Sequence, residues 1–331
     1  MRAFLVAAAI ASVHTPTLDG ERTEFPVIDA YGGRVVWSDW DAAAGRWRLM
    51  EHSGGEVRAV PVAPGTVPFD IDLGPDGHGG ALAVYSRHGR LYSYSFARGR
   101  ETALGVRGAW PAVWGSRLAF VRTTRHKDRH GRRVQRVYWR VRRGSAPSHR
   151  LRLPSPVIAV RMTGPGGTTV ERRRLSFAVS ELDMRRRRVA YKWDRIDDTD
   201  TTHFVYVATT GGRLRAVAPG AAVGGGATDR PRDVRFPALG AHGAVDWLFT
   251  NEISPAYFGA FLHESGGGVQ ASPRTKAAAF AHGARTAYWI DAGPGAAYEA
   301  ESQPGGTFPL MADGAVAYRP MPRNWLPISP P

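Results

Sequence analysis

The side chains in this sequence that could carry out chemistry gather in a few short charged runs. One run is acidic: four aspartates lie between Asp194 and Asp200, and His203 follows them. Carboxylate oxygens are the ligands that calcium prefers. The run lacks the Asp-x-Asp-x-Asp-Gly spacing with a downstream Glu that marks a strong calcium motif. We therefore favour a solvated loop, salt-bridged to a neighbouring basic loop, and keep calcium binding as the alternative.

A second group of possible ligands surrounds the turn at residues 74–77. The residues of this group are Asp70, Asp72, Asp76 and His78. An aspartate that precedes glycine in a tight turn commonly accepts hydrogen bonds from nearby backbone N–H groups, while the glycine takes up a positive φ. A structural turn is thus the favoured interpretation, and we expect no metal here.

The segment from Arg122 to Arg143 is strongly basic and contains two aromatic residues, Tyr138 and Trp139. Because side chains alternate between the two faces of a strand, one face would carry arginines on either side of Tyr138. The residues of that face are Arg136, Tyr138, Arg140 and Arg142. They could hold a polyanion or single-stranded nucleic acid by charge and stacking. The favoured interpretation is an outer strand whose arginines extend into solvent while Trp139 packs inward.

Signatures of catalysis are missing from the sequence. It contains no Gly-x-Ser-x-Gly nucleophile elbow, no His-Glu-x-x-His helix, no phosphate-binding glycine loop and no dinucleotide fingerprint. The absence of cysteine excludes disulfides, thiol catalysis and zinc–thiolate sites. We therefore favour a protein without enzymatic activity, although an active site assembled from loops of separate repeats would leave no local motif.

A repeated pattern of strands must position these charged runs. Each copy has an apolar stretch, a turn with glycine or charged residues, and a second apolar run that ends in an aromatic residue. One copy is Phe25–Asp29 followed by Arg34–Trp37. The closing aromatic residues of the copies are Trp37, Tyr85, Phe120, Tyr191, Trp247, Tyr288 and Tyr318. Their separation is close to the length of one propeller blade.

A second hairpin follows each of the first six copies, so each unit has four short strands joined by tight turns, which is one antiparallel blade. We expect an all-β protein, a β-propeller of four-stranded antiparallel blades, with seven blades favoured and six as the alternative. Residues 12–331 would form a single propeller domain, and a strand near Ser12–Glu21 would close the ring with the C-terminal strands. The segment Val157–Thr169 fits no unit and is expected to be an insertion or an extra strand.

The strand–turn–strand from Phe69 to Tyr85 resembles the Ser-Pro-Asp-Gly repeat of TolB-like and WD-type propellers. This sequence departs from that motif at Gly74, where the repeat has serine. The resemblance implies the propeller architecture over most of the chain. It implies no activity, because propellers host many unrelated functions.

In a four-stranded meander, the loops between the second and third strands emerge on the same face as the connections between blades. We call this the loop-rich face and expect binding there, because long loops of neighbouring units gather on it. The candidate binding residues on this face are Asp39, Trp40, Asp41, His126, Lys127, Arg129, Asp194, Asp197, Asp198, Asp200, Asn251, Glu252 and Asp291. None of them is assigned to catalysis.

Residues 1–11 have the features of a signal peptide: Arg2 provides a charged start, Ala3–Ile10 form an apolar run, and small residues end it. The alternative is a short first strand. The run is too short to span a bilayer, and no later stretch is long enough. We therefore expect no membrane span and a secreted, extracellular or cell-envelope location.

The chain of 331 residues has a formal net charge of +15, supplied mostly by arginine. A basic exported protein is attracted to anionic polymers. We predict a monomeric, non-enzymatic recognition or scaffold propeller without cofactors, which binds a protein or an anionic polymer; nucleic acid is not the expected partner. The alternative is a propeller hydrolase or lyase on a glycan or ester, with Asp39, Asp194 and Glu252 around the central channel and a bound calcium ion.

Overall fold

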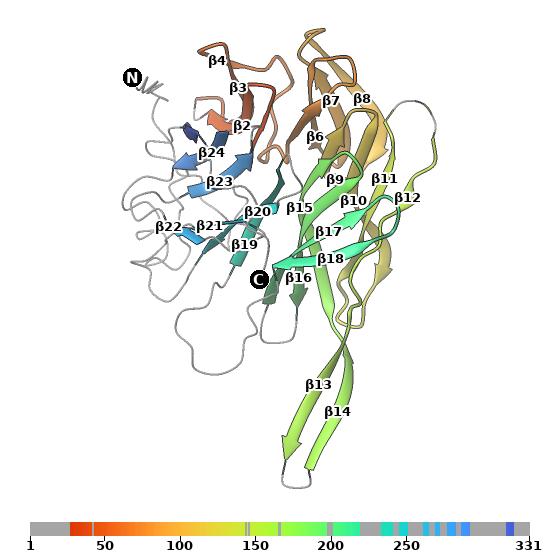
Figure 1. The fold of residues 1–331 in the computed structure, drawn as a ribbon. Helices are drawn as coiled ribbons and strands as arrows, with labels where there is room; N and C mark the ends of the chain where they lie inside the picture. The colour runs from red at the N-terminus through yellow and green to blue at the C-terminus, as the bar shows by residue number, and fades with distance from the viewer. Residues whose placement is uncertain are drawn as a thin grey trace.

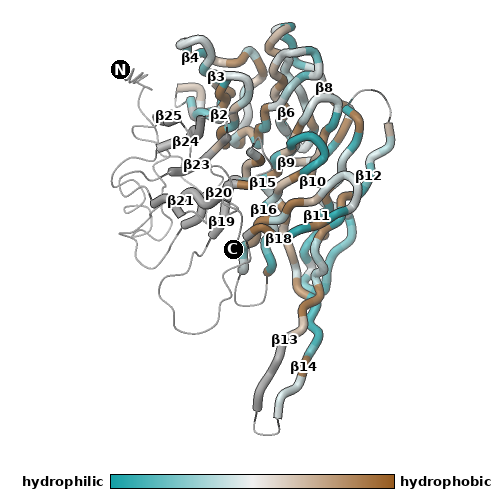
Figure 2. Tube along the Cα trace, viewed as in Figure 1, coloured by the Kyte–Doolittle hydropathy of each residue, from teal (hydrophilic) through white to brown (hydrophobic). Residues whose placement is uncertain are grey.

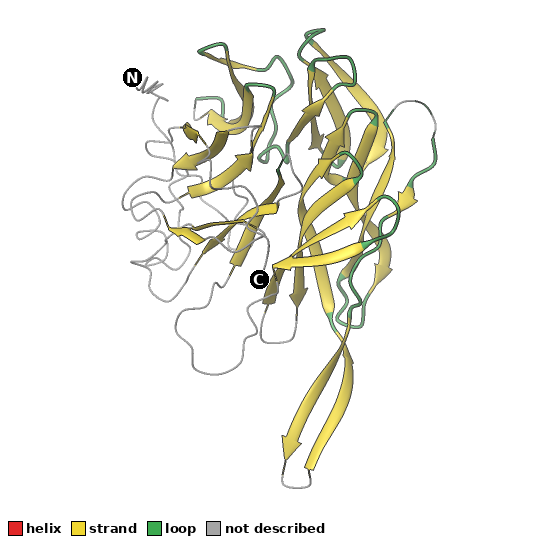
Figure 3. Cartoon of the chain, viewed as in Figure 1, coloured by secondary structure: helices red, strands yellow, loops and turns green. Residues whose placement is uncertain are grey.

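The computed structural model describes residues 27–41, 43–142, 144, 146–164, 167–196, 201–218, 233–240, 245–250, 261–264, 269–271, 277–282, 286–291 and 316–320. Within these ranges every regular element is a β-strand, and every strand pair is antiparallel. Figure 1 shows the strands gathered into separate sheets that stand side by side, and Figure 3 draws strands and loops without a helix in this part of the chain. None of these residues forms a helix that could cross a membrane.

The first sheet shows how the sequence builds a blade. It is a meander of β1 (Ile28–Tyr31), β2 (Arg34–Asp41), β3 (Arg46–Ser53) and β4 (Glu56–Ala59), hydrogen-bonded in chain order. The two-residue turn between β1 and β2 consists of Gly32 and Gly33, both with a positive φ. That conformation matches the twist of the flanking strands and is open to glycine at low cost.

Four further sheets repeat the same order. Blade 2 comprises β5 (Asp72–Pro75), β6 (Ala81–Arg87), β7 (Arg90–Ser95) and β8 (Arg100–Arg107). Blade 3 comprises β9 (Ala109–Trp114), β10 (Arg117–Lys127), β11 (Arg133–Val141) and β12 (His149–Arg150). Blade 4 comprises β15 (Ser176–Arg185), β16 (Arg188–Ile196), β17 (Thr201–Thr209) and β18 (Leu214–Ala218). Blade 5 comprises β19 (Asp233–Leu239), β20 (Val245–Thr250), β21 (Phe261–Glu264) and β22 (Val269–Ala271).

The sixth sheet bears on the predicted blade count, and the count of seven is not confirmed by it. It contains β23 (Ala277–His282), β24 (Thr286–Asp291) and β25 (Val316–Pro320), and β25 pairs with β24. The segment that the repeat pattern predicts as part of a seventh unit is thus the third strand of the sixth sheet. The favoured count of seven is not supported by the described residues, which form six blades and one separate hairpin.

The first strands of the six blades form a closed ring. Contacts run from β1 to β5, β9, β15, β19 and β23 in turn, and β23 contacts β1 again. Because β23 already packs against β1, the ring of described strands closes with six blades. The predicted closing strand near Ser12–Glu21 and the predicted signal peptide at residues 1–11 lie outside the described residues, so both stay predictions.

The closing aromatic residues of the repeat form the centre of the packing between blades. The side chains of Trp37, Tyr85, Phe120, Tyr191 and Trp247 are all buried. In blade 6 the pairing register places Trp289, and not the predicted Tyr288, at the equivalent position, because Phe280 pairs with Trp289. Figure 2 shows hydrophobic and hydrophilic residues alternating along the strands of the blades. The large aromatic residues fill the space between adjacent sheets, where truncation to alanine typically costs about 3–5 kcal/mol.

The segment that fits no repeat is an inserted hairpin. It consists of β13 (Val157–Gly164) and β14 (Gly167–Arg174), which pair only with each other among the described strands. Figure 1 shows this hairpin projecting away from the blades. Nearly every residue of β14 is exposed, so the insertion adds surface and not core.

Candidate functional site

The predicted residues of blade 1 form ion pairs inside their own sheet. The guanidinium of Arg48 on β3 lies 3.6 Å from the carboxylate of Asp39 and 3.3 Å from that of Asp41 on β2. Trp40 lies between them on β2, and its side chain is outside the described part. An ion pair that involves an exposed arginine contributes about 0–1 kcal/mol to the free energy of unfolding. These two carboxylates therefore stabilise the hairpin locally.

The structure describes the two ends of the acidic run of blade 4, Asp194 and His203. Asp194 on β16 faces His203 on β17, with 2.8 Å between Oδ1 and Nδ1, and the ammonium of Lys192 lies 3.9 Å from the same carboxylate. Asp291 lies at the end of β24. Asp197, Asp198, Asp200, Asn251 and Glu252 lie outside the described residues.

Calcium binding stays a prediction. In the parts of the chain that the structure describes, no group of three or more His, Asp or Glu side chains is arranged to hold a metal ion. The second predicted group is structural at Asp76, whose Oδ1 accepts hydrogen bonds from the N–H groups of His78 and Gly80 at 2.6 and 3.0 Å. These bonds hold the turn in the way that the sequence pattern predicts.

Carboxylates do converge on the axis of the ring, but Asp29, Asp72 and Asp183, which line it, are none of the three that the enzymatic alternative places there. Asp72 accepts a 2.6 Å hydrogen bond from the N–H of Val113 in the next blade. Asp29 accepts one from Leu73, and Asp183 accepts one from Leu239. The positions that correspond to these aspartates in the other three blades, judged by strand register, are Ala112, Ala238 and Ala281. Three aspartates thus tie the first strand of one blade to the first strand of the next.

Burial and mutual repulsion perturb these axial carboxyls. Burial, and then the charge of Asp183, raises the pKa of Asp29 well above its ordinary value. Burial, and then the charges of Asp29 and Asp183, raises the pKa of Asp72 well above its ordinary value too. Burial also raises the pKa of Asp70 to about 6, against hydrogen bonds from Trp110 and Ser86 that lower it. Aligning the repeats by strand register would have revealed Asp29, Asp72 and Asp183, because these three aspartates occupy the same position in their repeats.

The cavity at the axis is too small for a substrate. It measures about 40 Å³ and is lined by residues of all six first strands, including Asp29, Asp72 and Asp183. A water molecule occupies about 30 Å³ of liquid. Ligand pockets usually measure about 300–1,000 Å³. The axis therefore works as a packed polar hub that joins the blades.

Among the described residues, exposed basic side chains gather on blade 3 and the inserted hairpin. We call this the basic surface. It consists of Arg125, His126, Lys127, Arg129, Arg132, Arg133, Arg172, Arg173 and Arg174. All of these side chains are exposed except that of Arg173, which is partly exposed. The predicted binding residues His126, Lys127 and Arg129 are thus part of a larger basic group than the sequence indicated.

Asp128 shapes the turn that carries this surface. Its Oδ1 accepts hydrogen bonds from the N–H groups of His130 and Arg132, each at 2.9 Å. Its Oδ2 accepts a 2.5 Å hydrogen bond from the hydroxyl of Ser176, the first residue of β15. Slight burial acts to raise the pKa of Asp128, but the hydrogen bonds from Ser176 and the turn outweigh it and lower that pKa. The single carboxylate therefore joins the β10–β11 turn to the start of β15, two residues after the hairpin ends.

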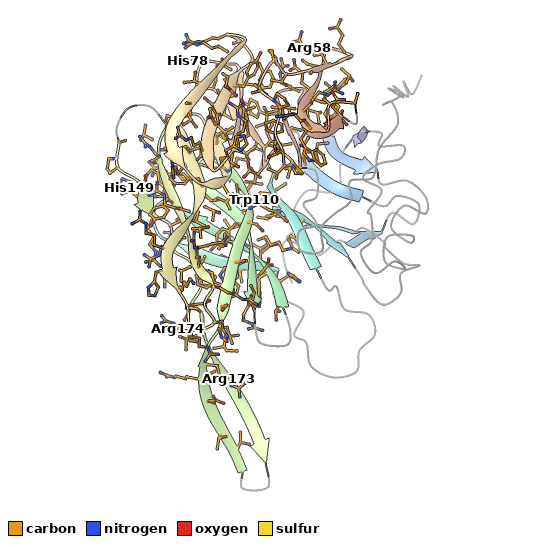
Figure 4. The ribbon with its side chains drawn as sticks, turned by 180° about the vertical axis from the view of Figure 1, so that it is seen from behind. Arg58, His78, Trp110, His149, Arg173 and Arg174 are labelled. Atoms are coloured by element: carbon orange, nitrogen blue, oxygen red, sulfur yellow. The ribbon has the colours of Figure 1, made fainter. Side chains whose placement is uncertain are left out.

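The stem of the hairpin extends the basic surface. Arg172, Arg173 and Arg174 pair with Ala159, Ile158 and Val157 on β13. Arg173 forms an ion pair of 3.0 Å with Glu171, which lies on the same strand face. Figure 4 shows Arg173 and Arg174 at one end of the molecule, with Arg58 and His78 at the opposite end. The acidic groups within the basic surface, Asp128 and Glu171, are both engaged in local bonds.

On the basic strand predicted from Arg136 to Arg142, several side chains are engaged in ring stacking or in hydrogen bonds to the backbone. Tyr138 stacks on Phe120 at 6.0 Å between ring centroids, and Trp139 stacks on His149 at 4.9 Å. Arg142 hydrogen-bonds to the carbonyl oxygens of Asp76 and Gly115. With its aromatic rings occupied, this strand fits the favoured interpretation of a structural strand better than that of a stacking platform.

The strand topology defines the class of protein: an all-β propeller of antiparallel four-stranded blades. No protein-family model matches the sequence, and no curated protein matches it. The solved structures similar to this chain include TolB from Acinetobacter baumannii, with a TM-score of 0.47 and 12% identity over 78% of this chain and 58% of that one. This chain thus spans less than two thirds of the length of that TolB.

Structures from a peptidase and from a protease are also similar. The acylaminoacyl peptidase of Pyrococcus horikoshii has a TM-score of 0.42 and 10% identity, over 81% of this chain and 49% of that one. The β-propeller domain of the Trilobed protease of Pyrococcus furiosus has a TM-score of 0.39 and 8% identity, over 75% of this chain and 83% of that one. The resemblance to TolB-like propellers predicted from the sequence is confirmed for the fold, and it extends no further.

Proposed function

We propose that this protein is an exported, non-enzymatic recognition propeller that binds an anionic polymer through the basic surface. The observation that carries the proposal is that two arginine-rich elements, the β10–β11 turn and the end of β14, lie close together. The hydrogen bond between Asp128 and Ser176, the first residue of β15, holds the turn beside the point where the hairpin ends. The location that we propose is the cell envelope or the extracellular space, and the protein acts there as a monomer.

Charge and exposure support a polymer as the ligand. The arginine and lysine side chains of the basic surface extend into solvent from two elements, so they can follow a chain of successive negative charges. Each contact of this kind releases counterions from a polyanion, which makes the affinity fall steeply with salt. A surface of this kind selects for charge density more than for one chemical group.

The structure offers less support to the enzymatic alternative. Asp39 pairs with Arg48, and Asp194 pairs with His203 and Lys192. Both carboxylates are thus engaged in contacts within their own blades. The cavity at the axis, at about 40 Å³, has no room for a sugar ring.

The test is a binding titration with a purified poly(glycerol phosphate) polymer at several salt concentrations. We expect the logarithm of the association constant to fall linearly with the logarithm of the salt concentration. The variant Arg125→Glu/Arg132→Glu/Arg172→Glu should abolish binding at 150 mM salt. The matched control Arg46→Glu/Arg90→Glu/Arg107→Glu changes the net charge equally on blades 1 and 2 and should weaken binding by less than about threefold.

Two results would overturn the proposal. The first is the same loss of affinity in both triple variants, which would make the attraction a property of net charge alone. The second is the absence of salt-dependent binding to any of several polyanions, such as a phosphodiester polymer, a sulfated polysaccharide and a polyuronic acid. That second result would favour a protein partner.

A further inference from the structure

The opposite face of the propeller carries a cavity that the basic surface does not involve. It measures about 580 Å³ and lies between blades 2 and 3, on the side of the β5–β6 and β7–β8 turns. Figure 4 shows His78, which lines it, at the end of the molecule away from Arg173 and Arg174. We call this cavity the arginine pocket. The polar residues that define it here are Asp76, Ser93, Ser95, Arg98, Arg100 and Arg142.

One wall of the arginine pocket is held in place by backbone hydrogen bonds. The guanidinium of Arg142 donates to the carbonyl oxygen of Asp76 at 3.2 Å and to that of Gly115 at 3.4 Å. The first bond connects the end of β11 in blade 3 to the β5–β6 turn of blade 2, and the second lies within blade 3. A guanidinium that is fixed in advance loses little conformational entropy when it binds a ligand.

A second wall presents hydroxyl groups and an arginine from neighbouring strands. Arg100 pairs with Ser95 in register, and Thr102 pairs with Ser93. Residues directly opposite each other in a sheet point to the same side, so these four side chains share one face. Ser93 is buried and forms part of the lining, whereas Arg100 is exposed. Arg98 adds a third guanidinium from the β7–β8 turn.

The charges of the lining favour an anion. The lining holds three arginines and one acidic residue, Asp76. The carboxylate of Asp76 accepts hydrogen bonds from the N–H groups of His78 and Gly80, so it stabilises the turn. Guanidinium groups and hydroxyl groups together match the several acceptor oxygens of a phosphate, because each arginine can donate two parallel bonds. The volume of the pocket lies within the range of small-molecule sites and exceeds what one phosphate needs.

We infer that the arginine pocket binds a phosphate or diphosphate group attached to a unit of about the size of one sugar. The phosphate lies against the three arginines, and the attached polar unit lies against the hydroxyl groups of Ser93, Ser95 and Thr102. This site is separate from the polymer-binding surface proposed above, because it lies on the other face and shares no residue with it. Its ligand is either a free small molecule or the phosphorylated end of a longer chain.

Isothermal titration of the whole protein with inorganic pyrophosphate and with glucose 1-phosphate tests the inference. We expect saturable binding of at least one of the two probes, and the variant Arg98→Gln/Arg100→Gln should weaken it at least tenfold. The control Arg90→Gln/Arg107→Gln removes two exposed arginines from the far ends of β7 and β8 and should change the affinity by less than twofold. Equal thermal melting of both variants verifies that the fold is intact.

Further measurements separate the sources of the ligand and the two sites. A phosphorylated polymer end would compete with pyrophosphate, whereas the same polymer after phosphatase treatment would not. The triple variant of the basic surface, Arg125→Glu/Arg132→Glu/Arg172→Glu, should bind pyrophosphate as the unmodified protein does. The inference is overturned if neither probe binds, if sulfate at equal ionic strength gives the same heats, or if Arg98→Gln/Arg100→Gln leaves the affinity unchanged.

Discussion

The carboxylate of Asp72 accepts a 2.6 Å hydrogen bond from the backbone N–H of Val113, and this bond crosses from blade 2 to blade 3 at the axis of the ring. Asp29 and Asp183 make the equivalent bond at two other boundaries. The first strands of a propeller have a partner strand on one side only within their own blade. An aspartate on one first strand can therefore satisfy an N–H group on the next that would otherwise be buried without a partner.

Replacing Asp72 tests the strength of this connection. We expect Asp72→Ala to lower the free energy of unfolding by about 1–3 kcal/mol, because it leaves the N–H of Val113 buried without its acceptor. Chemical denaturation followed by tryptophan fluorescence measures the change. The control Asp41→Ala removes a surface ion pair and should cost less than about 1 kcal/mol. Equal effects of the two substitutions would show that the axial bond contributes nothing special.

The pKa of Asp70 predicts how stability changes with pH. Burial raises this pKa from 3.8 to about 6. A carboxyl group with a higher pKa in the folded state than in the unfolded state binds its proton more tightly when folded, so acid favours folding. The difference corresponds to at most about 3 kcal/mol. This contribution to stability is present below pH 4 and is lost as the pH rises through 6.

Urea denaturation between pH 5 and 7.5 measures that dependence. The free energy of unfolding should rise as the pH falls, and Asp29 and Asp72, whose pKa values are also raised, act in the same direction. The variant Asp70→Asn should be less stable overall but show a shallower slope, because it has no proton to bind. In Asp128→Asn the slope should stay as it is, since the pKa of Asp128 is lowered and lies below this pH range. An unchanged slope in Asp70→Asn would contradict the prediction.

Two buried tyrosines at the same repeat position should respond in opposite ways to the loss of their hydroxyl groups. The hydroxyl of Tyr85 donates a hydrogen bond to Glu101, which also pairs with Arg87. The hydroxyl of Tyr191 is buried and has no partner among the described residues. We expect Tyr85→Phe to cost about 1–2 kcal/mol and Tyr191→Phe to be neutral or stabilising. Thermal melts of the two variants measure these changes in stability. A larger loss of stability in Tyr191→Phe than in Tyr85→Phe would contradict the prediction.

Gly74 occupies the position at which this sequence departs from the Ser-Pro-Asp-Gly repeat, and the structure supplies a reason. A Cβ atom on Gly74 would lie 2.2 Å from the carbonyl oxygen of Val113 in blade 3. Gly74→Ser should therefore push blades 2 and 3 apart and cost about 1–3 kcal/mol or more. Gly211→Ala is the matched control, since the nearest atom to its added Cβ is the hydroxyl oxygen of Thr209 at 3.8 Å. Wild-type stability in Gly74→Ser would disprove the close approach.

The repeat pattern alone was sufficient to predict the blades, because the information in it is local. Alternating apolar residues, glycine turns and a closing aromatic residue specify a hairpin wherever they occur, so Trp37, Tyr85, Phe120 and Tyr191 could be predicted as core residues. The Asp76 turn was predictable for the same reason, since its hydrogen bonds span only four residues.

The number of blades and the meeting of distant residues depended on the closure of the ring. The last strand, Val316–Pro320, has an apolar pattern that fits a new blade, and only its pairing with Thr286–Asp291 assigns it to the sixth. Asp29 and Asp183 look like ordinary strand residues in the sequence, and they reach the axis because the first strands stand side by side. The hydrogen bond that Ser176 donates to Asp128 likewise spans 48 residues. Contacts of this kind follow from how whole sheets pack against one another, which no short segment of sequence specifies.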